Sequence, residues 1–248
     1  MLVSPDEAIS ASKQAYLQTL QPLAREGKID SDRQMAARVR WITGRIIGQA
    51  IGLYPNTANW DWSIKVIDDP EVVNAWCMAG GRMAVYTGLF EKLKLTDAEF
   101  AQIMGHEISH ALANHTAERM SRAMATSVGI VAIGVMSDKP LATMAGGAMA
   151  AKVALELPNS RTAETEADKI GMELAVRAGY DPDAAVSLWQ KMGSMGGSAP
   201  PEFLSTHPAP GNREAELAAM IPEMRKLNPT GKLARVTAIE IVRDAPAP

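Results

Sequence analysis

The chain has 248 residues, of which 47% are hydrophobic and 21% charged, the composition of an ordinary globular protein. Its formal net charge of −3, without a long basic run, gives no electrostatic reason to expect nucleic acid as a partner. Cys77 is the only cysteine, which excludes an internal disulfide bond but is typical of both cytosolic and many bacterial envelope proteins.

Two helices are predicted at the N-terminus. A capping box formed by Ser4 and Glu7 begins the first helix, which runs to about Arg25. The second helix begins near residue 30, carries apolar residues at steps of three and four, and ends at Gly52. The first ten residues lack a basic region followed by an apolar stretch, so they are not a signal peptide.

A small antiparallel sheet is predicted next, because the period of the sequence changes after residue 60. Residues 62–67 alternate between apolar and polar side chains, as a strand does. Residues 74–78 and 83–86 flank Gly80-Gly81, an arrangement typical of a hairpin.

The rest of the chain is predicted to be mainly helical. A capping box formed by Thr96 and Glu99 begins a helix that continues to about Met120. The weakly polar stretch 123–136 would span roughly 21 Å as a helix, short of the ~30 Å hydrocarbon core, so no transmembrane segment is predicted. The later predicted elements are two short helical segments broken near 138–140, a helix over 161–178, a helix from Asp181 to about Met192, loops at 193–201 and 208–211, a helix from Asn212 to Met220 ended by Pro222, and a strand at 234–242.

The pattern His106-Glu107-Ile108-Ser109-His110 lies within the capped helix. A step of four residues puts His106 and His110 on one helical face, where both imidazoles can reach a single metal ion. Glu107 projects beside that ion, where it can take a proton from an attacking water without being a ligand. Chance and a metal-free buried helix are the competing interpretations, and burying two imidazoles with a carboxylate would then be costly.

The third protein ligand of this zinc site does not come from the same helix. A metzincin would have glycine and histidine where this chain has Ala113 and Thr116. In a continuous helix His115 would lie nine steps from His106, on the opposite face, so it is predicted to be a helix-surface residue or one that supports a ligand.

A later helix offers carboxylates for the third position. Glu164 and Asp168 are four residues apart, which allows Glu164 to bind the metal while Asp168 accepts a hydrogen bond from a ligand imidazole. Glu166 points elsewhere and is predicted to be solvated or in an ion pair. His207 lies in a predicted loop, where a single histidine is usually incidental. The chain has only four histidines, however, and three of them could belong to one site, which favours an active-site role for His207.

Several motifs in order resemble one family, the HtpX and CAAX-prenyl-protease group of zinc metallopeptidases, family forty-eight. The chain looks closest to the soluble periplasmic members such as BepA and LoiP. The matching segments are Asn74-Ala75, Gly80-Gly81, Tyr86–Leu89, Gly105–Ala111, Ser160-Arg161, Glu164–Asp168, Ala178–Pro182, Trp189–Met192 and Ser205–Pro208 with Arg213.

The resemblance implies an α+β, mostly helical, gluzincin-like fold, with an N-terminal helical region packed on the catalytic core. It also implies Glu164 as the third zinc ligand, with Asp168 as its supporting partner. In some relatives the histidine that matches His207 reaches the zinc and gates the site. The chain departs from the family at Ala163, where relatives favour a polar residue, and lacks the spanning helices of the membrane-embedded members.

Zinc-dependent hydrolysis of peptide bonds is the expected chemistry, with one Zn²⁺ per chain. Glu107 would remove a proton from water and later pass it to the departing amine. His207 and Arg213 are the candidate donors to the oxyanion. The substrate is expected to add as an extra strand along the edge formed by Met83, Ala84, Val85 and Tyr86.

The expected function is endoproteolysis of unfolded or misassembled proteins in cell-envelope quality control. The main alternative is a non-cleaving, chaperone-like module that binds proteins in the same groove. A helical scaffold with a structural zinc is a third interpretation, although structural sites are usually rich in thiolates.

One peptidase domain is expected over residues 1–248, with an N-terminal helical region at 1–58, a catalytic core at 59–228 and a tail at 229–248. Protein or peptide substrates are the expected partners, and the full-length protein is expected to associate peripherally or through a lipid anchor with a membrane. The periplasm or cell envelope is the expected compartment if a targeting segment is missing from this sequence, and the cytoplasm is the alternative.

Overall fold

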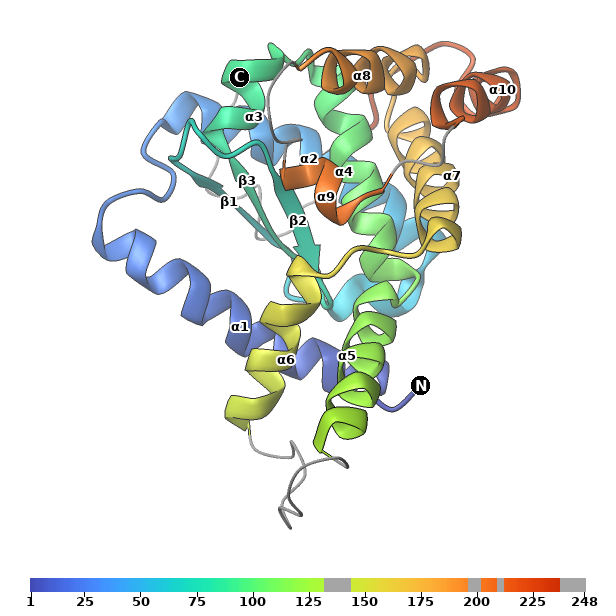
Figure 1. Ribbon diagram of the computed structural model, residues 1–248. Helices are drawn as coiled ribbons and strands as arrows, with labels where there is room; N and C mark the ends of the chain where they lie inside the picture. Colours follow the sequence, from blue (N-terminus) through green and yellow to red (C-terminus); the bar gives the residue numbers. More distant parts are fainter. Residues whose placement is uncertain (132–143, 196–201, 209–211, 237–248) are drawn as a thin grey trace.

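The computed structural model describes residues 1–131, 144–195, 202–208 and 212–236, in which helices surround a three-stranded sheet (Figure 1). In chain order the elements are α1 (Pro5–Arg25), α2 (Arg33–Leu53), the 3₁₀ helix η1 (Pro55–Asn59), β1 (Ser63–Ile67), β2 (Ala75–Met78), β3 (Arg82–Tyr86), α3 (Thr87–Leu93), α4 (Asp97–Leu112), α5 (His115–Val131), α6 (Met144–Glu156), α7 (Arg161–Arg177), α8 (Asp183–Ser194), α9 (Glu202–Thr206) and α10 (Arg213–Arg225). Among these described helices, none combines the length and the apolar character needed to cross a bilayer.

The sheet has the strand order β1–β3–β2 and is mixed rather than wholly antiparallel. β2 and β3 form the predicted antiparallel hairpin, and Gly80 and Gly81 adopt the positive φ angles that its turn requires. β3 then inserts between β2 and β1 and runs parallel to β1. The prediction of a substrate-binding edge at Met83–Tyr86 is therefore wrong, because β3 is hydrogen-bonded on both sides and the edges belong to β1 and β2.

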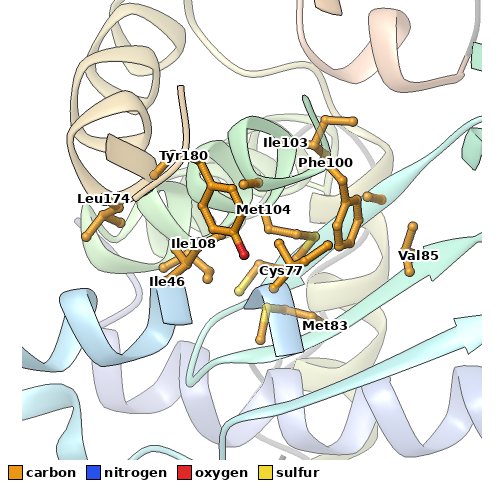
Figure 2. Close-up of a cluster of buried hydrophobic side chains, with 14 of the residues drawn as sticks. Ile46, Cys77, Met83, Val85, Phe100, Ile103, Met104, Ile108, Leu174 and Tyr180 are labelled. Carbon is orange, nitrogen blue, oxygen red and sulfur yellow. The ribbon is translucent and has the colours of Figure 1, made fainter. Parts of the chain in front are cut away.

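Both faces of this sheet are covered by helices. One face packs on α2 and α4, with α7 packed in turn on α4. On this face residues such as Cys77 and Met83 meet Phe100 and Met104 of α4 (Figure 2). The other face, which includes Trp76, packs on α1, α5 and α6. Successive side chains of a strand point to opposite faces of the sheet, and here both faces are covered. All residues of β2 are therefore buried.

The two N-terminal helices begin where their capping residues predict. In α1 both bonds of the capping box between Ser4 and Glu7 are formed. In α2 the side chain of Asp32 caps the first turn, two residues after the predicted start. Each helix covers a different face of the sheet, so the region 1–58 contributes to both hydrophobic clusters.

The helix that carries His106 and His110 ends earlier than predicted. The capping box of Thr96 and Glu99 is present, but α4 stops at Leu112 and a separate helix, α5, begins at His115. Between them Asn114 has a φ of 60°, a left-handed conformation that asparagine tolerates. This break changes the direction of the chain and removes the basis for placing His115 on the opposite face.

The C-terminal half differs from the prediction at three points. His207 directly follows the short helix α9 rather than lying in a free loop, and its N–H bonds to the carbonyl of Phe203. Pro222 lies inside α10, which continues to Arg225 because a proline near a helix end forfeits only one backbone hydrogen bond. Residues 234–236 are not in a strand, while the rest of the predicted strand, the break near 138–140 and most of the two predicted loops lie outside the described residues.

Candidate metal centre

Four buried side chains converge at the centre of the molecule. His106 and His110 come from α4, Glu164 from α7, and His207 from the end of α9. One ligand atom from each lies within 4.8 Å of all the others. The Nε2 atoms of His106 and His110 are 3.0 Å apart, and Nδ1 of His207 is 3.0 Å from Oε1 of Glu164. Sequence reasoning named all four residues.

The helices that carry these ligands cross at unusually close range. A Cβ atom added to Gly105 would lie 2.5 Å from the carbonyl oxygen of Gly171, and one added to Gly171 would lie 2.6 Å from the backbone nitrogen of His106. Only glycines permit this contact between α4 and α7. The crossing brings Glu164 and Asp168, which lie about two turns and one turn before Gly171, alongside His106.

Ion pairs hold His106 and Glu164 on the side of the centre that faces Asp168 and Arg213. Asp168 lies 3.0 Å from Nδ1 of His106, as predicted for a partner that orients a ligand. Arg213 contacts Oε2 of Glu164 at 3.0 Å and Oδ1 of Asp168 at 2.5 Å, and its guanidinium lies 3.8 Å above the Trp189 ring. Carboxylates therefore engage both terminal amino groups of Arg213. This arrangement fits the predicted role of supporting the metal-binding residues better than the predicted role of donating to an oxyanion.

His115 also supports a ligand, because the break after α4 turns it back toward the site. Its Nδ1 lies 2.8 Å from Nδ1 of His110, and its Nε2 lies 3.3 Å from Oε2 of Glu166. If His110 presents Nε2 to a metal, its Nδ1–H donates to His115, and His115 in turn donates to Glu166. Glu166, predicted to be solvated or in an ion pair, thus accepts a hydrogen bond from an imidazole that orients a ligand.

Glu107 is 3% exposed, and its Oε1 atom lies 3.2 Å from Nε2 of His207. The alignment of this contact is not that of a hydrogen bond, so buried Oε1 has no hydrogen-bond partner in the described part of the chain. A buried carboxylate oxygen without a partner is costly unless another group engages it. Glu107 therefore has a free acceptor beside the four ligands.

The shifted pKa values of His106, Glu164 and His110 indicate a site for a metal cation. Burial alone would lower the pKa of His106, but the carboxylates of Glu164 and Asp168 outweigh it and raise this pKa to about 9. Burial alone would raise the pKa of Glu164, but the neighbouring imidazoles hold it well below its usual range. Burial and the adjacent imidazoles lower the pKa of His110 well below its ordinary value. One divalent ion would satisfy all these donor atoms at once, and three imidazoles with a carboxylate suit zinc.

Two further polar residues reach the centre, and sequence reasoning missed both. The side-chain nitrogen of Asn159 lies 3.4 Å from Nδ1 of His207 and 3.5 Å from Nε2 of His110. Nη1 of Arg119 in turn donates to Oδ1 of Asn159. Neither residue belongs to a spaced motif: Asn159 precedes the cap of α7, and Arg119 lies in the second turn of α5.

A cleft of about 1070 Å³, including its open mouth, leads to this centre. Its walls come from α1, α5, α6, α9 and the edge strand β2. Glu107, Arg119 and His207 lie at its inner end together with Ala75 and Cys77 of β2. Peptides can therefore approach the free acceptor of Glu107 from the side of the exposed strand edge.

Comparison with known proteins agrees with this geometry. Residues 34–221 match Peptidase family M48. The chain therefore belongs to peptidase family M48, as the resemblance of its motifs indicated.

Relatives of two kinds match at moderate identity. Over 166 residues the chain is 37% identical to the mitochondrial metalloendopeptidase OMA1 of Arabidopsis thaliana, covering 66% of this chain and 32% of that protein. It is 34% identical to the mitochondrial metalloendopeptidase OMA1 of Bos taurus over 188 residues, or 71% of this chain and 35% of that protein. It is 30% identical to the Beta-barrel assembly-enhancing protease of Escherichia coli (strain K12) over 190 residues, or 73% of this chain and 39% of that protein. The chain thus spans well under half the length of these relatives.

Proposed function

We propose that this protein is a zinc-dependent endopeptidase that cleaves extended segments of unfolded or misassembled proteins. The observation that carries the proposal is the meeting of four buried metal-ligating atoms with Glu107 beside a cleft. In the described part of the chain Oε1 of this carboxylate accepts no hydrogen bond. Membership of peptidase family M48 supports it, as do the names of the relatives, which are metalloendopeptidases and a protease.

His106, His110 and Glu164 would hold one zinc ion per chain, with His207 as a fourth donor. When bound, zinc supplies Lewis-acid polarisation of the scissile carbonyl and lowers the pKa of water toward ~7. Asp168, Arg213 and His115 hold the ligands in orientation from behind, which leaves the cleft side open to substrate.

Glu107 would act as the proton carrier of the reaction. Its free Oε1 takes a proton from the attacking water and later passes it to the nitrogen of the departing amine. Burial suits this role, because few waters compete for the carboxylate. A protein that only binds its clients has no use for such a base, and this argues against the chaperone-like alternative.

Substrate would pair with β2, the strand whose edge borders the cleft, rather than with β3. The N–H of Tyr86 donates to the carbonyl of Asn74, and the alternation of an antiparallel pair then turns the backbone groups of Cys77 away from β3. Cys77 and Ala75 both line the cleft. An extended peptide added along this edge uses main-chain hydrogen bonds, which gives broad sequence tolerance and requires an unfolded segment.

The bacterial cell envelope is the compartment that we propose, with peripheral or lipid-anchored attachment of the full-length protein. The resemblance of the motifs and the name of the E. coli relative support it, whereas the OMA1 relatives are named mitochondrial. Fractionation of cells that express the natural full-length gene is the test, and recovery in the cytosol would refute the assignment.

Cleavage of casein by the zinc-loaded protein, with and without a chelator, tests the proposed activity. We expect cleavage that the chelator abolishes and added zinc restores. A Glu107→Gln variant separates the alternatives, because it should bind unfolded casein without cleaving it. Equal behaviour of wild type and variant, with binding and no cleavage in either, would favour the chaperone-like module.

A further inference from the structure

Asn159 is placed beside the metal-binding atoms by contacts on three sides. Its backbone N–H donates to the carbonyl of Thr206 at 3.0 Å, which ties it to the end of α9. Its side-chain nitrogen lies 3.4 Å from the same carbonyl and 3.4–3.5 Å from ring nitrogens of His207 and His110. The residue is 5% exposed, so these are its surroundings rather than water.

The orientation of this amide is fixed by Arg119. A guanidinium can only donate hydrogen bonds, so the atom of Asn159 that faces Nη1 of Arg119 must be the carbonyl oxygen. The NH₂ group must then face the centre. When His110 and His207 use their ring nitrogens on a metal, those nitrogens no longer accept hydrogen bonds. One amide proton of Asn159 can donate to the carbonyl of Thr206, and the other is then available to an oxygen atom of the substrate.

Arg119 adds a buried positive charge at the same point. It is 4% exposed, lines the cleft, and its Nε has no hydrogen-bond partner in the described part of the chain. In the described part of the chain Arg119 forms no ion pair with a carboxylate, and the charges of Glu107 and Glu164 act on it only from farther away. A buried cation that no carboxylate contacts directly is costly, and it favours negative charge that develops nearby.

The other candidate donors are engaged elsewhere. Arg213 is held behind the ligands by Glu164 and Asp168. His207 directs Nδ1 into the ligand cluster and Nε2 toward Glu107. When water attacks the scissile carbonyl, the electron pair of the C=O double bond moves to oxygen, and that charge needs a donor besides the metal.

We propose that Asn159 donates a hydrogen bond to the developing oxyanion and that Arg119 is the positioning residue that holds its amide in place. This inference rests on the proposed peptidase function and assigns that reaction a residue that the spaced motifs do not include. Asn159 touches the reacting oxygen, whereas Arg119 acts through Asn159.

The test compares Asn159→Ala with Asn56→Ala, the same change at an exposed position in η1. In the zinc-loaded protein we expect Asn159→Ala to lower kcat roughly 10²–10³-fold with little change in KM. Zinc content by elemental analysis should stay at the wild-type level. Affinity for a phosphinic peptide, whose tetrahedral centre carries the negative oxygen, should fall at least about tenfold, while affinity for the matching amide peptide should not.

A second pair of variants tests the role of Arg119. Arg119→Met should lower kcat, Arg119→Lys should restore part of it, and Arg119→Met should add little in the Asn159→Ala background, since both act on one hydrogen bond.

Three outcomes would overturn the inference. Asn159→Ala with the kcat of Asn56→Ala would show that the amide is not a donor. Loss of zinc, or a rise in kcat, would show that Asn159 only holds His207. A wild-type protein that cleaves nothing would refute the proposed function itself. The Asn56→Ala control would then also be inactive, whereas it stays active if only the role of Asn159 is wrong.

Discussion

The two sides of the metal centre differ in how well their polar groups are paired. Behind the ligands, Asp168 and Arg213 complete a set of ion pairs with His106 and Glu164. There only Nε of Arg213 lacks a hydrogen-bond partner among the described residues, and carboxylates hold both of its terminal amino groups. On the cleft side, Glu107 Oε1 and Arg119 Nε are both buried without hydrogen-bond partners in the described part of the chain. Such unpaired groups are costly in a folded protein, and they cluster where chemistry needs them. The paired side thus holds the ligands, and the unpaired side is free to meet substrate.

Removing the free acceptor should have the largest effect on turnover. Glu107→Gln keeps the size of the side chain but cannot take a proton, so kcat should fall by about 10²–10⁴-fold. The same preparation should retain its zinc and its melting temperature, because Glu107 is not a ligand. Turnover near the wild-type level would show that another group carries the proton.

His207 lies between the two sides of the centre. The direction in which its substitution changes the cleavage rate distinguishes two roles for it. If the imidazole occupies the position needed by water, His207→Ala should raise the rate of cleavage of a short peptide. If instead it donates to the oxyanion, the rate should fall by about 100-fold. We expect the rise, because Nδ1 of His207 is 3.0 Å from Oε1 of Glu164 and lies among the ligand atoms. A clear fall with zinc retained would refute the gate.

The paired side should respond in metal affinity. Asp168→Ala removes the acceptor for Nδ1–H of His106, and loss of such a partner typically costs 10–100-fold in metal affinity. Competition with a zinc chelator measures this, with activity at saturating zinc as the control. A large drop in kcat at full zinc occupancy would show that Asp168 affects catalysis itself and not only metal binding.

The smallest effect is expected at Glu166, whose side chain is 54% exposed. Glu164→Gln should weaken zinc binding and abolish activity, while Glu166→Gln should change zinc affinity only a few-fold, because Glu166 reaches the metal only through His115 and His110. Chelator competition on both variants compares them directly. Equal losses would contradict the assignment of Glu164 as the ligand.

The paired side was predictable from sequence because its members repeat at helical spacing. His106 with His110, and Glu164 with Asp168, are each four residues apart on a helix marked by a capping residue. His115 was misplaced because the helix break at Asn114 carries no strong signal, and one left-handed residue redirects all that follows.

The cleft side depends on contacts between distant segments, which no local period records. Asn159 and Arg119 are 40 residues apart and meet only when α5, α6 and α7 are assembled. The edge strand was misassigned for a similar reason: hairpin spacing indicates that β2 pairs with β3, but not that β1 occupies the far side of β3. Sequence therefore named the four residues that the structure brings together, and the structure was needed for the residues that border the cleft.

Elemental analysis of the purified protein tests the central claim most directly. We predict one zinc per chain in the wild type and in Glu107→Gln, and none in the His106→Ala/His110→Ala double variant, which circular dichroism should show to be folded. Stoichiometric zinc in that folded double variant would contradict the account, because the metal would then lie somewhere other than the site built by α4, α7 and α9.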